Sequence, residues 1–260
     1  MRLSVDEVLE RSQWDFFWVP DDVSVVDRPE LLYVSCRRDV AHLNAVTRWR
    51  AEPSRYDALL AEVLAAHEDV ESRFMMVPHI ERPELVDALL EHGYGVGDAH
   101  DAMAIEVDRY TPRPAGEIVT RRVETLEQLD DALRVTAVAF GKGIGIPPAQ
   151  RAEALADCSG PGKRVFRVVA YDARSGEPLC AAGFTEFPEL SFGLFWGGGT
   201  IPSGRGRGAY SAVVAARVEE AARRGLKRVG LYARLNTSAP ICERQGFERH
   251  GRMVFWSRMP

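Results

Sequence analysis

The sequence of 260 residues is poor in the features that mark membrane, secreted or metal-binding proteins. No apolar run approaches the ~18 residues that a membrane span needs, and residues 1–7 have no apolar core of the kind found in signal peptides. No two cysteines form a CxxC pair, since the four are scattered as Cys36, Cys158, Cys180 and Cys242. This scatter argues against a zinc site and a disulfide framework, and it fits a reducing compartment. We therefore expect a cytoplasmic protein with no metal site and no membrane partner.

The charge of the chain is divided unevenly along its length. Residues 1–117 carry 12 Lys+Arg against 24 Asp+Glu, whereas residues 118–260 carry 21 against 14. Within the second part, residues 201–260 alone carry 12 basic and 4 acidic side chains. A basic surface attracts polyanions, but this stretch has no ordered alternation of basic and aromatic residues and no DNA- or RNA-binding motif. We expect a small polyphosphate ligand and no nucleic acid; a solvated basic face that aids solubility is the alternative.

The most informative segment combines glycine with arginine at residues 204–208, directly before a predicted amphipathic helix at 209–224. Three glycines in five residues let the backbone approach a ligand closely and adopt conformations that a Cβ would forbid. The helix directs its unpaired N–H groups, and the positive end of its dipole, at the same turn. Two arginines add charge. The segment therefore predicts a phosphate or pyrophosphate site.

Two common phosphate-binding motifs do not fit this segment. A Walker loop needs Lys-Ser/Thr after its last glycine, but Ala209-Tyr210 stand there. A dinucleotide-binding fold needs its glycines after the first strand of a βαβ unit, with an acidic residue ~20 positions on. Here the glycines follow several predicted strands, late in the chain. An ATPase, a GTPase and a dinucleotide-dependent enzyme are all disfavoured.

Two α/β domains are predicted, each with a central mixed sheet flanked by helices. Residues 108–116 contain two prolines and a glycine, and the charge balance changes sign just after them, so the domains are placed at 1–113 and 114–260. In the first, patterning predicts helices at 5–11, 54–67 and 82–92 and strands at 23–26, 31–36, 73–77 and 102–107. In the second, it predicts a loop at 141–148, helices at 125–140, 151–157, 209–224 and 239–245, and strands at 118–123, 164–172, 179–187, 190–200, 227–233 and 247–257.

A short echo connects the two halves. Glu91-His92-Gly93-Tyr94 ends a predicted helix and enters a strand, as Arg244-Gln245-Gly246-Phe247 does later. The echo indicates a degenerate internal duplication, with chance as the alternative because helix–Gly–aromatic–strand is a common sequence. The first half has no counterpart to the arginine–glycine segment. If it is a duplicate, it has lost the ligand site.

The order of predicted elements in 118–260 resembles the GNAT superfamily of acyl-CoA-dependent N-acyltransferases. The family signature [Gln/Arg]-x-x-Gly-x-[Gly/Ala], between the fourth strand and third helix, corresponds to Arg205-Gly206-Arg207-Gly208-Ala209-Tyr210. Asn236 and Ala239 before a short helix that ends in Gly246-Phe247 match the family as well, with one residue fewer between. The resemblance implies a tandem arrangement with a degenerate first half. Two positions depart from the pattern: Tyr210 replaces the last glycine, and Cys242 replaces a frequent tyrosine.

The resemblance also implies a cofactor site for acetyl-CoA. The amides of residues 205–210 would hold the pyrophosphate, the end of the fourth strand would pair with the pantetheine arm, and Asn236 would touch that arm. Arg205 and Arg207 would add charge-assisted contacts. The residues expected to bind CoA are Gly198, Gly199, Thr200, Arg205, Gly206, Arg207, Gly208, Ala209, Tyr210 and Asn236.

The catalytic groups are less well marked. Cys242 occupies the position of the family's proton donor and is either that donor or a buried packing residue, with Tyr210 and Tyr232 as substitutes. Glu186 and Glu189, the acidic residues nearest the fourth strand, are candidates for the base that deprotonates an amine; the alternative is a solvated carboxylate. Metal ligands are not expected.

The resulting expectation is an N-acetyltransferase that moves an acetyl group directly from acetyl-CoA to a primary amine of a small molecule or to a protein amino group. The alternative is a non-catalytic CoA-binding module. Either would be a monomer or homodimer. The first half would shape the acceptor side, and its aromatic residues would line an acceptor pocket or pack in a core; these are Trp14, Phe16, Phe17, Trp18 and Trp49.

Overall fold

The computed structural model describes residues 3–19, 21–38, 40–114, 116–141, 146–160 and 162–260. Part of the loop expected at 141–148 lies outside these residues. The α-helices are α1 (Val5–Arg11), α2 (Tyr56–Ala66), α3 (Pro83–Glu91), α4 (Leu126–Phe140), α5 (Arg151–Cys158), α6 (Ala209–Arg223) and α7 (Ser238–Arg244). The strands are β1 (Ser24–Arg28), β2 (Leu31–Ser35), β3 (Ala45–Trp49), β4 (Ser72–Met76), β5 (Gly95–Glu106), β6 (Ile118–Arg122), β7 (Val165–Asp172), β8 (Pro178–Phe187), β9 (Phe192–Thr200), β10 (Arg228–Arg234) and β11 (Glu248–Arg258).

The chain divides into two compact units that are not continuous in sequence. The first contains residues 1–102, 233–239 and 250–260, and the second contains residues 103–232 and 240–249. β5 and β11 therefore each contribute to both units. The prediction that two sequence domains meet near residue 113 stays a prediction.

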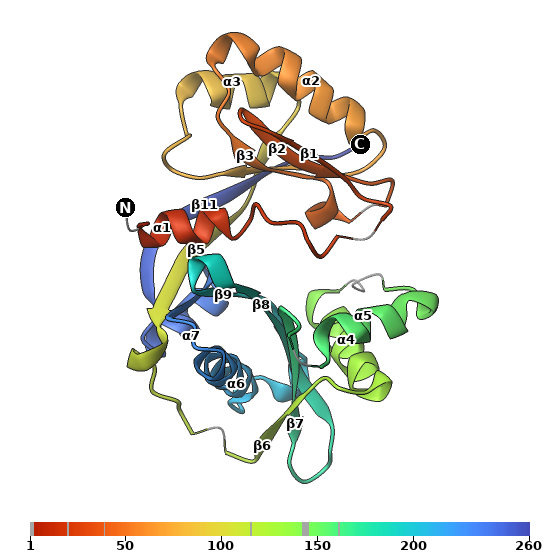
Figure 1. Cartoon of the computed structure of the whole chain (residues 1–260), viewed down its shortest axis with the longest axis vertical. Coiled ribbons are helices and arrows are strands. Elements are labelled where there is room, and N and C mark those ends of the chain that lie inside the picture. The colour runs from red at the N-terminus through yellow and green to blue at the C-terminus, as the bar shows by residue number, and fades with distance from the viewer. Residues whose placement is uncertain (1–2, 20, 39, 115, 142–145, 161) are drawn as a thin grey trace. The chain divides into compact units, whose positions relative to one another are not determined.

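In the first unit, the strand order is β1-β2-β3-β4-β11. β3 and β4 are parallel, whereas β11 runs antiparallel to β4, from Val254↔Met76 to Arg258↔Ser72. Helices α2 and α3 cover one face of this sheet (Figure 1). Their apolar residues pack on the strands in one core, whose buried side chains include Leu59, Leu60, Phe74, Leu85 and Trp256. The last strand of the chain thus completes the core of the first unit.

In the second unit, β5 is followed by β10-β9-β8-β7-β6. β9 and β10 are parallel, and the pairs β6–β7, β7–β8 and β8–β9 are antiparallel. Helix α4, with α5 beside it, lies on one face of β7–β9, and α6 lies on the other (Figure 1). α4 begins with the expected capping box, since the Gln128 N–H donates to Thr125 Oγ1 at 3.3 Å and the Gln128 side chain accepts from the Thr125 N–H.

The two units repeat one order of elements. β1-β2-β3-α2-β4-α3-β5 and β7-β8-β9-α6-β10-α7-β11 both run strand, strand, strand, helix, strand, helix, strand. Gly93 and Gly246, which end α3 and α7, are both left-handed, with φ of +80° and +89°. The following aromatic N–H reaches back five residues in each case, from Tyr94 to the Leu89 carbonyl and from Phe247 to the Cys242 carbonyl. This order and closure support the predicted duplication.

Two strand predictions in the first unit need correction. β3 was not expected, and it places Trp49 in the core at 3% exposure. β5 was expected at 102–107 but begins at Gly95. In the structure, a Cβ on Gly97 would lie 2.7 Å from the Phe255 carbonyl oxygen, so this glycine allows close approach to β11.

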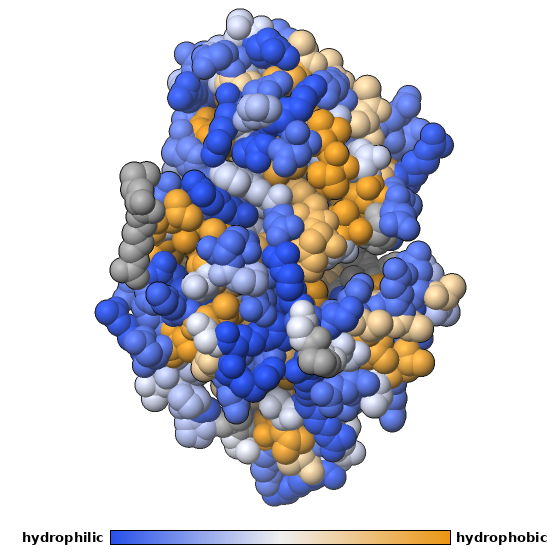
Figure 2. Space-filling model, viewed as in Figure 1, coloured by the Kyte–Doolittle hydropathy of each residue, from blue (hydrophilic) through white to orange (hydrophobic). Residues whose placement is uncertain are grey.

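One face of the surface can be followed in Figure 2. The face drawn in Figure 2 is largely hydrophilic, with separate apolar patches between the charged side chains. Within the part of the chain that the structure describes, no helix is both long and apolar enough to cross a bilayer. The prediction of mixed α/β sheets flanked by helices is confirmed.

Candidate functional site

The arginine–glycine segment forms the turn between β9 and α6. The short 3₁₀ turn η6 (Pro202–Gly204) comes first, and Gly206 and Gly208 then take left-handed backbone angles, with φ of +72° and +86°. Gly208 is the N-cap of α6 and offers no side chain to the helix end. Among the described residues, the N–H groups of residues 206–211 have no recorded hydrogen bond, whereas the Arg205 N–H donates to the Pro202 carbonyl at 3.3 Å. The turn therefore presents a row of free backbone N–H donors that begins at Gly206.

The strand that leads into this turn carries a bulge. The β8–β9 register shifts between Ala181↔Gly199 and Gly183↔Trp196, and Gly197 at the shift is left-handed with φ of +61°. The next two residues, Gly198 and Gly199, face opposite sides of the sheet, as successive strand residues do. A Cβ on Gly198 would lie 2.9 Å from Tyr210 Cε2, and one on Gly199 would lie 2.7 Å from the Ala139 Cβ on α4. Glycine at both positions lets the helices pack against the bare strand.

β9 loses its pairing with β10 before it reaches the turn. The parallel register contains only Arg228↔Phe192, Val229↔Gly193 and Gly230↔Leu194, although β9 continues to Thr200. The end of β9 therefore has an edge that β10 does not cover. An extended ligand with amide groups can add to such an edge by backbone hydrogen bonds. Gly198, Gly199 and Thr200, the residues expected to pair with pantetheine, lie on this part of β9.

The two arginines of the turn have different surroundings. Arg207 forms an ion pair with Asp172, which begins the β7–β8 hairpin turn. Asp172 Oδ1 also accepts the N–H groups of Ser175 and Arg174, at 2.8 and 2.9 Å. The bond from the Ser175 N–H lowers the pKa of Asp172 most, and the bonds from Arg207 and the Arg174 N–H lower it further. Arg205 is exposed. Arg207 thus ties the turn to the hairpin, and Arg205 faces solvent.

Tyr210 and Cys242, the two residues that depart from the family pattern, lie side by side. The Tyr210 hydroxyl is 3.9 Å from Cys242 Sγ, which brings the first turn of α6 to α7. Cys242 is completely buried, and burial raises the pKa of its thiol. Burial likewise raises the pKa of the Tyr210 phenol. Both groups are therefore neutral at pH 7 and able to donate a proton.

Two further candidates lie on β10 and in the turn that leads from it to α7. Tyr232 is half-buried on β10. Asn236 is exposed in the turn and is grouped with residues 233–239 of the first unit. Its expected contact with a pantetheine arm stays a prediction.

Glu186 and Glu189 are not brought to the glycine turn. Both lie where β8 passes into β9, at the opposite end of β9 from Thr200. Glu186 Oε2 accepts from Arg224 Nη1 at 2.6 Å, just past the C-terminal end of α6, and Glu189 is exposed on η5 (Pro188–Leu190). α6 has 15 residues, and at ~1.5 Å per residue its two ends are ~22 Å apart. Neither carboxylate lies beside the first turn of α6.

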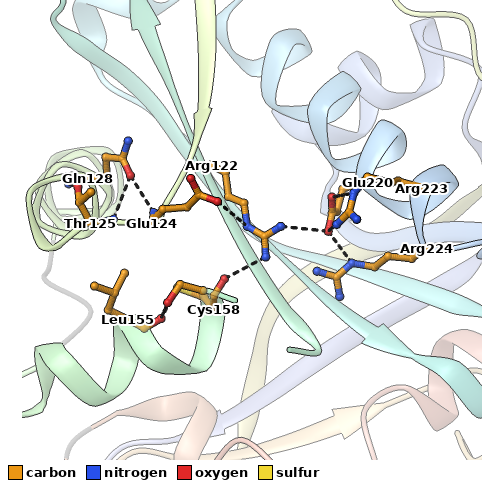
Figure 3. Close-up of polar contacts among 10 residues, drawn as sticks. Arg122, Glu124, Thr125, Gln128, Leu155, Cys158, Glu220, Arg223 and Arg224 are labelled. Carbon is orange, nitrogen blue, oxygen red and sulfur yellow. Dashed lines mark hydrogen bonds and ion pairs between the residues drawn. The ribbon is translucent and has the colours of Figure 1, made fainter. Parts of the chain in front are cut away.

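A charged cavity of about 540 Å³ occupies that far end, and Glu186 is one of its lining residues. Figure 3 shows Glu220 between Arg122 from β6 and the pair Arg223 and Arg224 from the end of α6. Glu220 Oε1 lies 2.6 Å from both Arg223 Nη2 and Arg224 Nε, and 3.6 Å from Arg122 Nη1. These pairs hold β6 to the C-terminal end of α6, where cations also offset the helix dipole.

The aromatic residues near the N-terminus do not share one environment. Trp49 is a core residue, packed on Tyr56 and Phe74. Trp14 donates its indole N–H to the Thr47 carbonyl at 3.2 Å and lies beneath several arginines. The others lie nearer the surface, with Phe17 43% and Trp18 39% exposed. Their predicted role at an acceptor pocket stays a prediction.

One residue of this region was missed from the sequence. Arg217 on α6 is 1% exposed, and among the described residues it has no carboxylate partner. Arginine on an amphipathic helix is ordinarily a surface residue. Its burial could have been predicted from its position, because residue 217 follows Val213 and Val214 by four and three places and so lies on the same apolar face of the helix. Metal-binding clusters of three or more His, Cys, Asp or Glu are absent from the described ranges.

No family model matches the sequence, and no curated protein matches it. Solved structures do match. A GCN5-related N-acetyltransferase from Kribbella flavida has a TM-score of 0.71 at 17% identity, covering 99% of this chain and 96% of its own. One from Sphaerobacter thermophilus has a TM-score of 0.58 at 19% identity, covering 91% and 75%. A tandem GNAT protein from the clavulanic acid biosynthesis pathway has a TM-score of 0.60 at 15% identity, covering 96% and 86%. The chain therefore has the fold of tandem GNAT proteins, and the predicted GNAT-like fold is confirmed.

Proposed function

We propose that the protein is an N-acetyltransferase that transfers an acetyl group from acetyl-CoA to a primary amine, on a small molecule or at a protein amino group. The observation that carries the proposal is the turn at 205–208, where two left-handed glycines and an uncapped helix leave a row of backbone donors. Such a row binds phosphate oxygens. The fold shared with N-acetyltransferases supports the same assignment.

The residues present fit the parts of CoA in order along the chain. The free N–H groups of residues 206–210 would bind the pyrophosphate, and exposed Arg205 would add a charge-assisted contact. The uncovered edge of β9 at Gly198, Gly199 and Thr200 would pair with the amides of the pantetheine arm. Arg207 would act mainly by fixing the turn through Asp172. The thioester would supply an activated acetyl group that an amine can attack directly.

The chain's own base is not assigned to Glu186 or Glu189, because neither lies at the turn end of β9. The acceptor amine would instead lose its proton to solvent before it attacks. Turnover should then rise with pH through the range in which the free acceptor amine deprotonates.

Two measurements on the purified chain test the proposal. Calorimetry with CoA measures binding, and a thiol-release assay measures turnover of acetyl-CoA against a panel of amino acids, polyamines, aminoglycosides and peptide N-termini. Binding with amine-dependent thiol release supports the proposal. Binding without turnover would support a non-catalytic CoA-binding module instead. Absence of CoA binding would exclude both.

A further inference from the structure

Arg217 is a buried cation on α6, and no anionic side chain among the described residues is paired with it. Its Nε donates to the Val213 carbonyl at 3.0 Å, and its Nη1 donates to the Gly183 carbonyl at 3.2 Å. The guanidinium carbon lies 4.1 Å from the centre of the Phe195 ring. Its Nη2 has no hydrogen-bond partner among the described residues. Burying a charge costs several kcal/mol unless an opposite charge compensates, so an unpaired guanidinium points to a negative charge that forms during function.

The direction of the Arg217 side chain shows where that charge would form. Side chains on an α-helix lean toward its N-terminus, and the bond to Val213 shows that Arg217 does so. Tyr210 lies seven residues earlier, two turns along the same stripe of α6. The groups that face the Tyr210 phenol are Arg217 from α6, Cys242 from α7 and Cys180 from β8. Burial raises the pKa of the phenol and of both thiols, and the Arg217 charge partly offsets that rise.

Tyr210 also lies at the strand that the proposed function assigns to the thioester arm. Its ring is packed on the bare backbone of Gly198, so closely that any Cβ there would collide with it. Its hydroxyl makes a long contact of 3.9 Å with Cys242 Sγ and can turn to a better acceptor. The neighbouring Tyr110 is engaged, because its hydroxyl donates to Gln245 Oε1 at 3.0 Å. Tyr210 is therefore the available phenol at this position.

Resting on the proposed function, we infer that Tyr210 donates the proton that the departing thiolate takes, and that Arg217 stabilises the phenolate left behind. The amine nitrogen forms a bond to the acetyl carbon, the carbon–sulfur bond breaks, and its electron pair goes to sulfur. Sulfur takes the phenol proton and becomes a thiol. The new amide nitrogen releases its extra proton to solvent, and solvent restores the phenol. Tyr210 is the catalytic residue, and Arg217 is a positioning residue that acts through it.

The main test compares Tyr210→Phe with Tyr171→Phe. Tyr171 is a matched control, since it is buried on β7 in the same unit and donates its hydroxyl to Asp131 Oδ2 at 3.0 Å. We expect Tyr210→Phe to lower kcat at least about 100-fold, the usual contribution of a general acid, with CoA affinity unchanged. Tyr171→Phe should keep wild-type kcat. Wild-type kcat in Tyr210→Phe would overturn the inference, as would a larger loss in Cys242→Ala than in Tyr210→Phe, because the thiol would then be the donor.

The role of Arg217 is tested with one variant that removes its positive charge and one that keeps it. Arg217→Met should lower kcat about 10- to 100-fold, the range for losing a hydrogen bond to a charged group, and Arg217→Lys should recover most of the loss. Equal kcat in the two variants would make Arg217 structural only. If Arg217→Met does not fold, Arg217→Lys and Tyr210→Phe still decide the outcome. A wild-type chain that neither binds CoA nor releases thiol refutes the proposed function itself; a wild type that turns over beside an unimpaired Tyr210→Phe refutes only this inference.

Discussion

Two glycines at opposite ends of α6 offer a matched test of the proposed CoA turn. Gly206 lies before the helix with φ of +72°, and Gly225 lies after it with φ of +73°. In both cases an added Cβ would have no atom of the protein within 4 Å. Gly206→Ala and Gly225→Ala therefore impose the same backbone strain without a steric clash. Only the first lies in the turn that would hold the pyrophosphate.

The strain sets the size of the expected effect. A left-handed backbone costs an L-residue about 1–2 kcal/mol, so each variant should lose about that much stability. At Gly206 the chain can relieve the strain by turning its peptide, which would redirect the neighbouring N–H groups. A ligand that binds those N–H groups must restore the strained backbone, and the energy of that strain then weakens its binding. We expect CoA to bind Gly206→Ala about 5- to 30-fold more weakly and to bind Gly225→Ala as it binds the wild type.

Thermal unfolding and calorimetry with CoA together decide this prediction. Similar losses of Tm in the two variants would show that the strain is matched. Wild-type affinity in Gly206→Ala at a matched loss of Tm would remove the turn from the site. Equal weakening in both variants would mean that CoA affinity follows stability rather than the geometry of the turn.

Three further predictions concern stability. Burial lowers the pKa of His67 in the folded chain, whereas in the unfolded chain the imidazole has its ordinary pKa of about 6.5. The unfolded chain therefore binds the proton more readily, and the free energy of unfolding should fall from pH 7 to pH 5. Urea titrations should show a less steep fall in His67→Gln. Trp256→Ala should cost about 3–5 kcal/mol in the same assay, whereas Met259→Ala, at a side chain 66% exposed, should cost almost nothing. Asp172→Asn should lower Tm at neutral pH. Because its bonds lower the pKa of the Asp172 carboxyl, that difference should persist to pH 4 and shrink only in stronger acid, and a constant difference would contradict the assignment.

The sequence predicted best those elements whose signals are local. The capping box at Thr125 fixed the start of α4, and Gly225 marked the end of α6, because caps act within one helical turn. β3 has no such signal. Its five residues are held by pairing with β2 on one side and β4 on the other, both outside the segment itself. Short strands of this kind depend on tertiary context, which patterning along one segment does not record.

The contrast between local signals and tertiary context also explains which parts of the candidate site could be predicted. Glycine before a helix start is a local phosphate-binding signal, and in the structure Gly206 and Gly208 are left-handed directly before α6. Proximity to a strand in sequence is not local in space. β9 has nine residues, and at ~3.3 Å per residue it is ~30 Å long. Glu186 and Glu189 are therefore beside this strand and still at its far end. Their closeness to β9 in the sequence did not show at which end of the strand they lie.

Tyr210 and Cys242 looked like two separate departures from the family pattern, and the structure makes them one feature. A tyrosine at the last position of the turn needs room for its ring, and that room lies between Gly198 and Cys242. Glycine leaves the strand bare, and cysteine is small where a tyrosine would fill the same space. A phenol therefore reaches this part of the unit from α6 instead of α7. Arg217, two turns further along α6, is then placed to act on that phenol, which explains why a buried helix position carries a cation.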